Sequence, residues 1–462
     1  MTERFSAREA IVLAGDDFRE LPVPMREFKP DGPLSWQGYD DSRRRALTRT
    51  GEDESVVCGT AVIGSTRVVL IAFEFGFLGG SLGERTGDRV EAAYTHARAH
   101  RLPVVSLVAT GGSRMQEGML ALTQLQRVAR QSALAREEGL PQIAVLRDPT
   151  TGGGWATLGA GADVTLALPG AQVGFAGSRV RPPDADPAAY TAEAQVAAGA
   201  VDAVVREEEL RETLTLWLTL LTAPTTDPGA EAGPEVEVGP EVEPVPPPAA
   251  LGAHGLPATG WDAVRHARSP ERPRAAAYLD AYFSRRAAIS GDRCGGSDDG
   301  MLCGFGSGPA GRTVAYAAQC GTATRPAGYR TAARLIRLAG RLGFPVLTLV
   351  DTPGAANDAQ AERQGAGSAI ADLFAAVATA RTPVTTLVIG EGGSGGALAL
   401  AAPGNTWATP DSYFSVIAPE LAAAILKRPA SEVHDTADQL RIRPQDLVEL
   451  GVIRGIVEHA KR

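Results

Sequence analysis

Lysine and cysteine are scarce in this 462-residue chain. Of its 45 basic residues only Lys29, Lys427 and Lys461 are lysine, so arginine must do nearly all anion binding. The four cysteines include no CxxC pair, which excludes a zinc ribbon or disulfide framework, and we expect no bound metal. The net charge of −9 argues against nucleic acid or a membrane surface as a partner.

Long apolar runs are also missing. No stretch approaches the roughly 18 apolar residues of a membrane span. The opening residues, "MTERFSAREA", carry acidic side chains and lack the apolar core of a signal peptide. We therefore expect a cytoplasmic protein. An apolar share of 44% over 462 residues suits two globular α/β domains.

Proline, glycine, glutamate and valine dominate residues 223–258, and the segment has no helical period. Such a composition cannot bury a core and predicts an exposed, semi-extended linker. It divides the chain into two parts of similar size, 1–222 and 259–462.

The two parts look like copies related by an offset of 242 residues. At that offset "LPVVSLVATGG" (Leu102–Gly112) falls on "FPVLTLVDTPG" (Phe344–Gly354). The segment "LPQIAVLRDPTTGGGWATLGAGAD" (Leu140–Asp163) falls on "TPVTTLVIGEGGSGGALALAAPGN" (Thr382–Asn405) without a gap. We infer a duplication.

Each copy predicts two apolar strands that end in glycine turns, with a helix between them. The predicted strands are Val104–Val108, Gln142–Leu146, Val346–Val350 and Val384–Ile389, and the predicted helices are Met119–Glu138 and Gly367–Arg381. This alternation predicts parallel strands joined by right-handed crossovers. Ligands on such sheets bind at the carboxyl ends of the strands, where the glycines lie.

Glycine at a strand-to-helix junction lets the backbone approach a ligand, and the first helical N–H groups have no intrahelical acceptor. They can stabilise an oxyanion. No GxxxxGK[ST] phosphate loop is present. Two turns in each half could bracket one carbonyl oxygen: Gly111 and Gly112 with Gly153 and Gly154, and Gly354 with Gly395, Gly396 and Ala397. The alternative is that the glycines only let helix and strand pack closely.

The stretch "GGSGG" also matches the G-x-S-x-G elbow of a serine hydrolase, with Ser394 as nucleophile. A triad could then use Asp411 or Asp438 with His434 or His459. The duplicated register, however, places Gly152 opposite Ser394, and no histidine lies in a repeated motif. We therefore favour the backbone amides over the serine.

Longer motifs carry a family resemblance. "GGSLGERTGDRVEAA", "TGGSRMQEGM" and "DPTTGGGWATLGAGADVTLALPGAQVGFAGSRV" resemble the β subunit of bacterial acetyl-CoA carboxylase carboxyltransferase. "PAGYRTAARLIRLAGRLGFPVLTLVDTPGA" and "VIGEGGSGGALALA" resemble its α subunit. The resemblance implies an α/β fold of two duplicated crotonase-like (ClpP/crotonase) ββα-superhelix domains. Residues 1–222 would form a β-like, acyl-CoA-binding domain and residues 259–462 an α-like, biotin-side domain, joined by the 223–258 linker.

By this resemblance, the chain moves a carboxyl group between biotin on a carrier protein and the α carbon of an acyl-CoA, through an enolate. Gly153 and Gly154 would face the thioester oxygen, and Gly396 and Ala397 the ureido oxygen of biotin. Gly111, Gly112, Gly354 and Gly395 would complete the two binding turns. No lysine resembles a biotinylation site and no ATP motif is visible, so a separate biotin carrier protein and biotin carboxylase are implied. A homodimer or larger homo-oligomer is also implied.

Five further side chains flank these turns. Arg114 positions the turn, reaches a CoA phosphate, or is a helix-start arginine paired with Glu117. Arg179 is a candidate rim residue. We interpret Asp351 and Glu391 as holding loop amides rather than transferring protons. Trp155 either narrows the acyl site or packs against the next helix.

The chain departs from the family pattern. The β subunit usually begins with a four-cysteine zinc ribbon, whereas no cysteine precedes Cys58 here. After "DTPGA" the family continues Tyr-Pro-Gly-Ile-Gly, but this chain reads "ANDAQAERQGAGS". The altered loop favours an alternative, a biotin-independent malonyl-thioester decarboxylase or related enolate-forming enzyme of a specialised pathway. A silent, scaffold-like paralogue is a third hypothesis, which retention of all four glycine turns disfavours.

Overall fold

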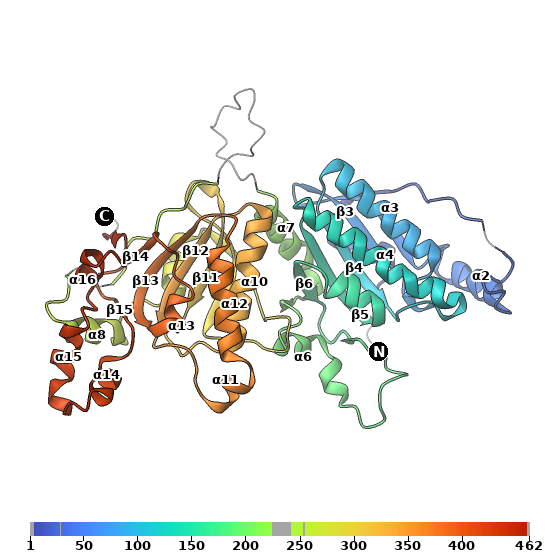
Figure 1. Cartoon of the computed structure of the whole chain (residues 1–462). Coiled ribbons are helices and arrows are strands. Elements are labelled where there is room, and N and C mark those ends of the chain that lie inside the picture. Colours follow the sequence, from blue (N-terminus) through green and yellow to red (C-terminus); the bar gives the residue numbers. More distant parts are fainter. Residues whose placement is uncertain (1–3, 28, 224–241, 253–254, 460–462) are drawn as a thin grey trace. The chain divides into compact units, whose positions relative to one another are not determined.

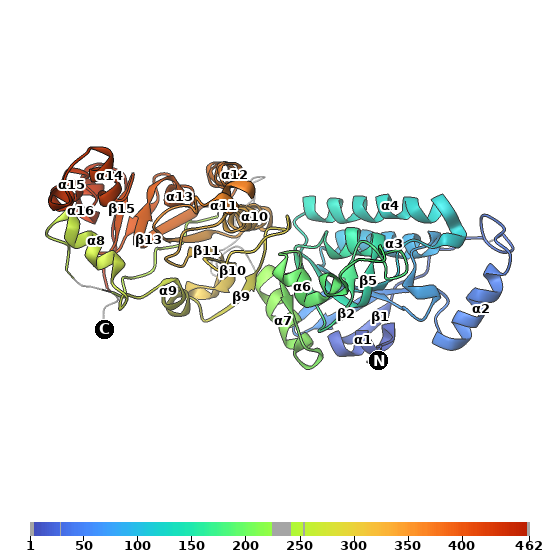
Figure 2. The same cartoon turned by 90° about the horizontal axis from the view of Figure 1, so that it is seen from below.

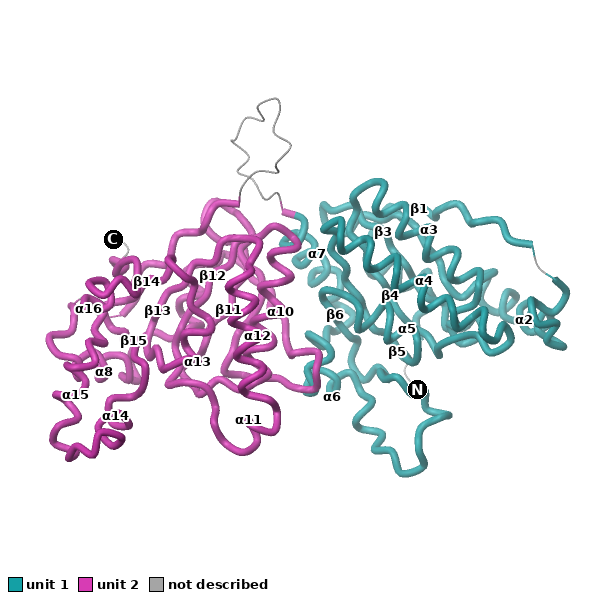
Figure 3. The backbone as a smooth tube through the Cα atoms, viewed as in Figure 1, with its two compact units in different colours: residues 1–222 teal, residues 223–462 magenta. Residues whose placement is uncertain are grey.

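The computed structural model describes residues 4–27, 29–223, 242–252 and 255–459. The chain divides into two compact units, Met1–Thr222 and Ala223–Arg462, coloured separately in Figure 3. Most of the expected linker, residues 224–241, lies outside the described residues.

Within its described residues, unit 1 is built on an eight-stranded sheet in the order β1-β2-β3-β4-β5-β6-β8, with β7 beside the end of β5. The strands are β1 (Asp16–Glu20), β2 (Val56–Ile63), β3 (Thr66–Phe73), β4 (Val104–Thr110), β5 (Gln142–Thr151), β6 (Val164–Ala167), β7 (Val173–Gly174) and β8 (Ala203–Val204). From β3 to β8 the strands are parallel, as predicted, whereas β1, β2 and β3 pair antiparallel.

Helices cover both faces of this sheet (Figure 2). They are α1 (Ala7–Ala14), α2 (Tyr39–Thr50), α3 (Glu84–His100), α4 (Gly118–Glu137), α5 (Gly152–Gly154), α6 (Ala192–Ala197) and α7 (Leu210–Leu221). In Figure 2, α3 and α4 lie together on one face, and α1 and α7 on the other. The central strands are buried on both faces, which explains their uninterrupted apolar runs.

Unit 2 repeats the plan in its described residues, with the sheet order β16-β14-β13-β12-β11-β10-β9 and β15 beside β13 (Figure 1). Its strands are β9 (Arg285–Ile289), β10 (Met301–Ser307), β11 (Thr313–Gln319), β12 (Val346–Thr352), β13 (Val384–Gly393), β14 (Thr406–Ala408), β15 (Tyr413–Ser415) and β16 (Gly455–Ile456). Its helices are α8 (Gly260–Arg268), α9 (Ala275–Tyr282), α10 (Pro326–Leu342), α11 (Ala359–Arg363), α12 (Ala366–Ala378), α13 (Ser394–Leu398), α14 (Pro419–Ile425), α15 (Val433–Gln439) and α16 (Pro444–Glu449).

The backbone confirms the duplication at the predicted offset of 242. Val104 pairs with Gln142 in unit 1, and Val346 pairs with Val384 in unit 2. Both pairs of strands shift register at the same place, before Thr110 and before Thr352. The match extends upstream of the compared sequences, because α3 and α10 are both 17 residues long and begin 242 positions apart. The two glycine-turn sites are therefore copies of one backbone design.

Part of the predicted linker is not exposed. Val245 and Ala250 are buried in unit 2, where Thr385 donates a hydrogen bond to the Val245 carbonyl at 2.8 Å. Ala250 donates through its amide to the Glu458 carbonyl at 3.0 Å. The prediction of an exposed linker is wrong for this stretch, because two apolar side chains among the prolines suffice to anchor it against a sheet.

Among the described residues, no helix has both the length and the apolar composition that a membrane-spanning helix requires.

Candidate active site at the glycine turns

In unit 1 the ends of β4 and β5 bring two glycine turns into backbone contact. The Gly112 amide donates to the Thr110 hydroxyl at 3.0 Å, which folds the first turn back on its own strand. A Cβ placed on Gly152 would lie 3.0 Å from the Gly112 Cα, and Gly152 has a positive φ of 64°. A side chain at Gly154 would collide with Thr110. Only glycine allows the two turns to lie this close.

Unit 2 makes the same turn with the same bond. The Gly354 amide donates to the Thr352 hydroxyl at 3.1 Å, and the second turn passes directly beneath it. A Cβ on Gly393 would collide with the Pro353 carbonyl, and one on Gly396 would collide with the Ala355 amide. Close packing therefore accounts for several glycines in both units.

Gly395 is different, because a Cβ there would have no neighbour within 4 Å. Its counterpart in unit 1, Gly153, is covered by the side chain of Leu125 from α4. The residue that corresponds to Leu125 in unit 2 is Gly367 of α12. Unit 2 therefore leaves a bare backbone surface at the start of α13, and packing does not explain why Gly395 is glycine.

The predicted amide donors lie in the first turns of these helices. Gly153 and Gly154 belong to α5, and Gly396 and Ala397 to α13. The first four N–H groups of a helix have no intrahelical acceptor, so they are available to a ligand. The duplicated register aligns Gly154 with Gly396 and Trp155 with Ala397, so the two predicted pairs differ by one position.

Two buried side chains fix the peptide group between Gly396 and Ala397. The Tyr329 hydroxyl donates to the Gly396 carbonyl at 3.1 Å, and the Gln319 side-chain amide donates to the same oxygen at 3.3 Å. Both side chains are almost completely buried. Because the peptide group is planar, holding this carbonyl also fixes the direction of the Ala397 N–H. Neither residue was identified from the sequence, since each lies more than 60 positions from Gly396.

Ser394 is exposed and is the first residue of α13, with a φ of 60° that matches the 64° of Gly152 at the start of α5. It therefore stands where the duplicated design needs a left-handed residue. The histidine candidate His434 stacks against Trp261 of α8, with ring centroids 4.6 Å apart. The acid candidate Asp438 accepts a hydrogen bond from the Gly260 amide. These contacts favour a structural role for His434 and Asp438.

Arg114 does not reach a solvent-exposed phosphate site. Its side chain is 1% exposed and forms ion pairs with Glu54 and Glu117, both 0% exposed. Its guanidinium also donates hydrogen bonds to Tyr39, Ser55 and Ser81, so it does not face the surface. The CoA-phosphate interpretation is corrected on this geometry, and the pairing with Glu117 is confirmed. Arg114 holds the segment after the Gly111–Gly112 turn in place.

This buried cluster has a consequence for protonation. Burial alone would raise the pKa of Glu54, but the adjoining Arg114 guanidinium and the Ser55 amide outweigh it and hold that pKa at about 2. Burial likewise raises the pKa of Tyr39, whose hydroxyl donates to Glu117 at 2.5 Å. Glu54 is therefore a carboxylate at neutral pH. The sequence offered no signal for its pairing with Arg114, 60 positions away.

Asp351 supports the second turn of unit 2, as predicted. It is fully buried, pairs with Arg272 at 2.7 Å and Arg274 at 3.2 Å, and accepts a hydrogen bond from the Glu391 amide at 3.2 Å. The Glu391 carboxylate binds Arg268 and the Tyr413 hydroxyl, each at 2.8 Å, rather than a loop amide. Both carboxylates are committed to structural partners.

Two more predicted residues have clear positions. Arg179 is exposed in the loop after β7, whose Phe175 carbonyl accepts a hydrogen bond from the Gly152 amide at 3.1 Å. Trp155 belongs to the core cluster of unit 1, and its ring lies against Gly159. This burial agrees with a packing role, although the contact is within its own helical segment rather than with the next helix.

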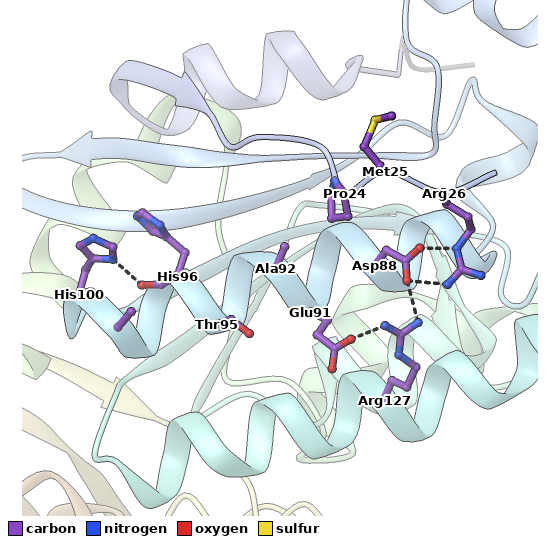
Figure 4. Close-up of a pocket in the computed structure, with 11 residues that line it drawn as sticks. Pro24, Met25, Arg26, Asp88, Glu91, Ala92, Thr95, His96, His100 and Arg127 are labelled. Carbon is purple, nitrogen blue, oxygen red and sulfur yellow. Dashed lines mark hydrogen bonds and ion pairs between the residues drawn. The ribbon is translucent and has the colours of Figure 1, made fainter.

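A cavity of about 590 Å³ lies away from the glycine turns (Figure 4). It is an open groove between residues 24–26, α3 and α4. Its charges neutralise one another, since Arg26 and Arg127 both bind Asp88, and Arg127 also binds Glu91. The groove therefore offers no uncompensated charge to a ligand.

Comparison with known proteins now decides the family. Residues 32–225 match the carboxyl transferase domain, and residues 257–462 match the acetyl co-enzyme A carboxylase carboxyltransferase-like family. The chain is 39% identical to the acetyl-coenzyme A carboxylase carboxyl transferase subunits beta/alpha of Salinispora arenicola, over 98% of this chain and 81% of that protein. The chain belongs to the acetyl-CoA carboxylase carboxyltransferase family. Its reaction is biotin-dependent carboxyl transfer, and the decarboxylase alternative is not favoured.

Further relatives agree with this placement. The beta/alpha subunits of Saccharopolyspora erythraea are 37% identical over 92% of this chain and 76% of theirs. A probable biotin-dependent acyl-coenzyme A carboxylase beta3 subunit of Mycobacterium tuberculosis is 34% identical over 89% of this chain and 81% of its own length. This carboxyltransferase thus has β-like and α-like halves in one chain.

Solved structures support the crotonase-like fold. The transcarboxylase 12S structure with methylmalonyl-coenzyme A and methylmalonic acid bound superposes with a TM-score of 0.77. It is 20% identical and covers 98% of this chain and 87% of its own. A single-chain, multi-domain long-chain acyl-CoA carboxylase gives a TM-score of 0.72 over 98% of this chain and 46% of its own.

Proposed function

We propose that the two glycine-turn sites, one in each unit and each made of two turns, divide the carboxyl transfer between them. The unit 1 turn would hold the acyl-CoA thioester, and the unit 2 turn would hold biotin. The observation that carries this proposal is the matched backbone of the two turns, down to the Thr110–Gly112 and Thr352–Gly354 hydrogen bonds. A reaction with two oxygen atoms to stabilise, one on each substrate, needs two such sites.

In unit 1 the N–H groups of Gly153 and Gly154 bind the thioester oxygen and stabilise the negative charge that develops on it in the enolate. One backbone donor aimed at such an oxygen typically lowers the barrier by about 3–4 kcal/mol. The close contact of Gly152 with Gly112 keeps these donors rigid, so little reorganisation is needed during the reaction.

In unit 2 the N–H groups of Gly396 and Ala397 bind the ureido oxygen of biotin. When bound, carboxylated biotin would supply the carboxyl group that is transferred. The residues fit a planar ring, because the surface beside Gly395 is open. Tyr329 and Gln319 orient the Ala397 donor. Asp351 and Glu391 are committed to arginines and Tyr413, so we assign no proton transfer to them.

Two protein partners are inferred, because the sequence shows neither a lysine that resembles a biotinylation site nor an ATP motif. Biotin would arrive on a separate carrier protein, loaded by a separate biotin carboxylase. A homodimer or larger homo-oligomer is proposed from the family, and the transcarboxylase 12S relative is described as a hexamer. Arg179 stays a candidate rim residue of the acyl-CoA site.

The reverse half-reaction tests this proposal. Purified protein is incubated with malonyl-CoA, with and without free biotin or a biotinylated carrier. We expect acetyl-CoA to form only when biotin is present. Decarboxylation of malonyl-CoA at the same rate without biotin would contradict the proposal. If malonyl-CoA were turned over neither with nor without biotin, the silent paralogue would be favoured.

A further inference from the structure

The phosphates of coenzyme A need cationic partners beside the unit 1 turn. Arg114 cannot serve, because its guanidinium is buried between two carboxylates. Helix α2 carries four arginines and two aspartates within twelve residues, a net charge of +2 in a chain whose total is −9. Both views place α2 at one end of unit 1 (Figures 1 and 2).

Contacts tie α2 to both sides of the Gly111–Gly112 turn. On the far side, the Tyr39 hydroxyl donates to Glu117 at 2.5 Å. On the near side, Arg49 donates to the Gly76 carbonyl, and Gly79, three residues later, accepts from the Gly111 amide at 2.8 Å. The helix therefore flanks the proposed thioester site.

Three arginines of α2 share one face. Arg44, Arg45 and Arg49, with Asp41 and Thr48, recur at helical spacing and line an open depression of about 420 Å³; we call this set the α2 arginine face. Arg44 is 75% exposed and pairs with Asp41, while Arg45 donates to Ser42 at 3.0 Å. Each guanidinium has five N–H donors, so these bonds leave donors free for an anion.

We propose that the α2 arginine face binds the phosphate groups of the CoA moiety, an inference that rests on the proposed acyl-CoA site of unit 1. Guanidinium binds phosphate through paired, charge-assisted hydrogen bonds. An acidic carrier protein is a weaker fit, since a stable protein interface buries about 800 Å² per partner and one exposed face of a twelve-residue helix offers less.

The test removes two charges and leaves the Arg49–Gly76 bond intact. The variant is Arg44→Gln/Arg45→Gln, and the matched control is Arg206→Gln/Arg265→Gln, which removes two arginines of similar exposure, 64% and 66%. KM is measured for malonyl-CoA, for malonyl-N-acetylcysteamine, a thioester without phosphates, and for a malonyl-loaded carrier protein. A melting curve for each variant confirms folding.

We expect KM for malonyl-CoA to rise about tenfold in the α2 variant and stay unchanged in the control. KM for the N-acetylcysteamine thioester should be the same in all three proteins. Unchanged KM for malonyl-CoA in the α2 variant would overturn the proposal while leaving the proposed function standing. A rise confined to malonyl-loaded carrier protein would overturn it in favour of protein docking.

If the wild-type protein turns over neither thioester, the proposed function fails and calorimetry with CoA alone decides this inference. Weaker CoA binding by the α2 variant than by the control would support it. Equal binding by both would overturn it.

Discussion

Gly395 is the residue that best separates ligand binding from packing. A side chain at Gly396 would displace neighbouring backbone, whereas one at Gly395 meets no atom within 4 Å. We therefore expect Gly395→Val to keep the melting temperature of the wild type and to lower biotin-dependent transfer at least tenfold. Because the valine side chain would occupy the surface that biotin needs, we expect KM for biotin to rise and KM for malonyl-CoA to stay unchanged.

Gly255 provides the matched control for that substitution, because a Cβ there also has no neighbour within 4 Å. Gly255→Val should leave both KM values unchanged. If Gly395→Val transferred carboxyl groups at the wild-type rate, the biotin assignment of the unit 2 turn would be wrong.

Tyr329 acts through the backbone as a positioning residue. Tyr329→Phe removes one of the two hydrogen bonds to the Gly396 carbonyl and keeps the ring in the core. Losing one bond should let the Ala397 N–H tilt, so we expect kcat with biotin to fall about tenfold with little change in KM for malonyl-CoA. Steady-state kinetics measures this split. A fall in thermal stability with unchanged kcat would show a purely structural role.

At the scale of elements, the Arg114 cluster joins α2, the start of β2 and the segment before α4. Arg114→Met would leave Glu54 and Glu117 buried without a cation, which typically costs about 3–5 kcal/mol. Hydrogen exchange of the β4 and β5 amides in the intact chain measures the loss within unit 1. The exposed pair Arg206–Glu209 is the control, and Arg206→Met should leave the exchange rates of these strands unchanged.

The same cluster predicts an acid dependence of stability. The native pKa of Glu54, about 2, lies below its ordinary value of 4.5, so its contribution is complete above pH 4.5 and is lost as the pH falls towards 2. In Arg114→Met the guanidinium is lost while burial and the Ser55 amide remain, so the Glu54 pKa should rise and the loss of stability of unit 1 on acidification should become smaller. Parallel pH profiles for the two proteins, from the same exchange measurement, would contradict this account.

The elements that could be predicted from the sequence are those whose buried faces give a strong apolar pattern. The predicted strand Val104–Val108 is β4, and the predicted helix Met119–Glu138 is α4 within one residue, because both have strong apolar patterns. Strand β5 continues past the predicted Leu146 to Thr151, where Pro149 and polar residues hid its end. The antiparallel strands before β3 were not predicted, since the comparison of the two copies began at Leu102.

For the whole molecule, the duplication was the most informative feature of the sequence. An offset of 242 applied to short apolar runs located both turns correctly, because each turn is set by local glycine chemistry. The partners of Arg114 and Gly396 could not be predicted the same way. They depend on contacts between residues distant in sequence, and the two units differ there: Arg114 corresponds to Ala356, and Tyr329 to Gly87.

The central claim is that the protein moves a carboxyl group between biotin, bound at the unit 2 site, and an acyl-CoA, bound at the unit 1 site, a reaction that can be followed in reverse. The most direct measurement follows the label from malonyl-CoA that is isotopically marked in its free carboxyl group, in the presence of biotinylated carrier. The account predicts that the label appears on the carrier in step with acetyl-CoA, and that Gly395→Val lowers the rate of this transfer at least tenfold. Label released entirely as carbon dioxide, at a rate independent of the carrier, would contradict it.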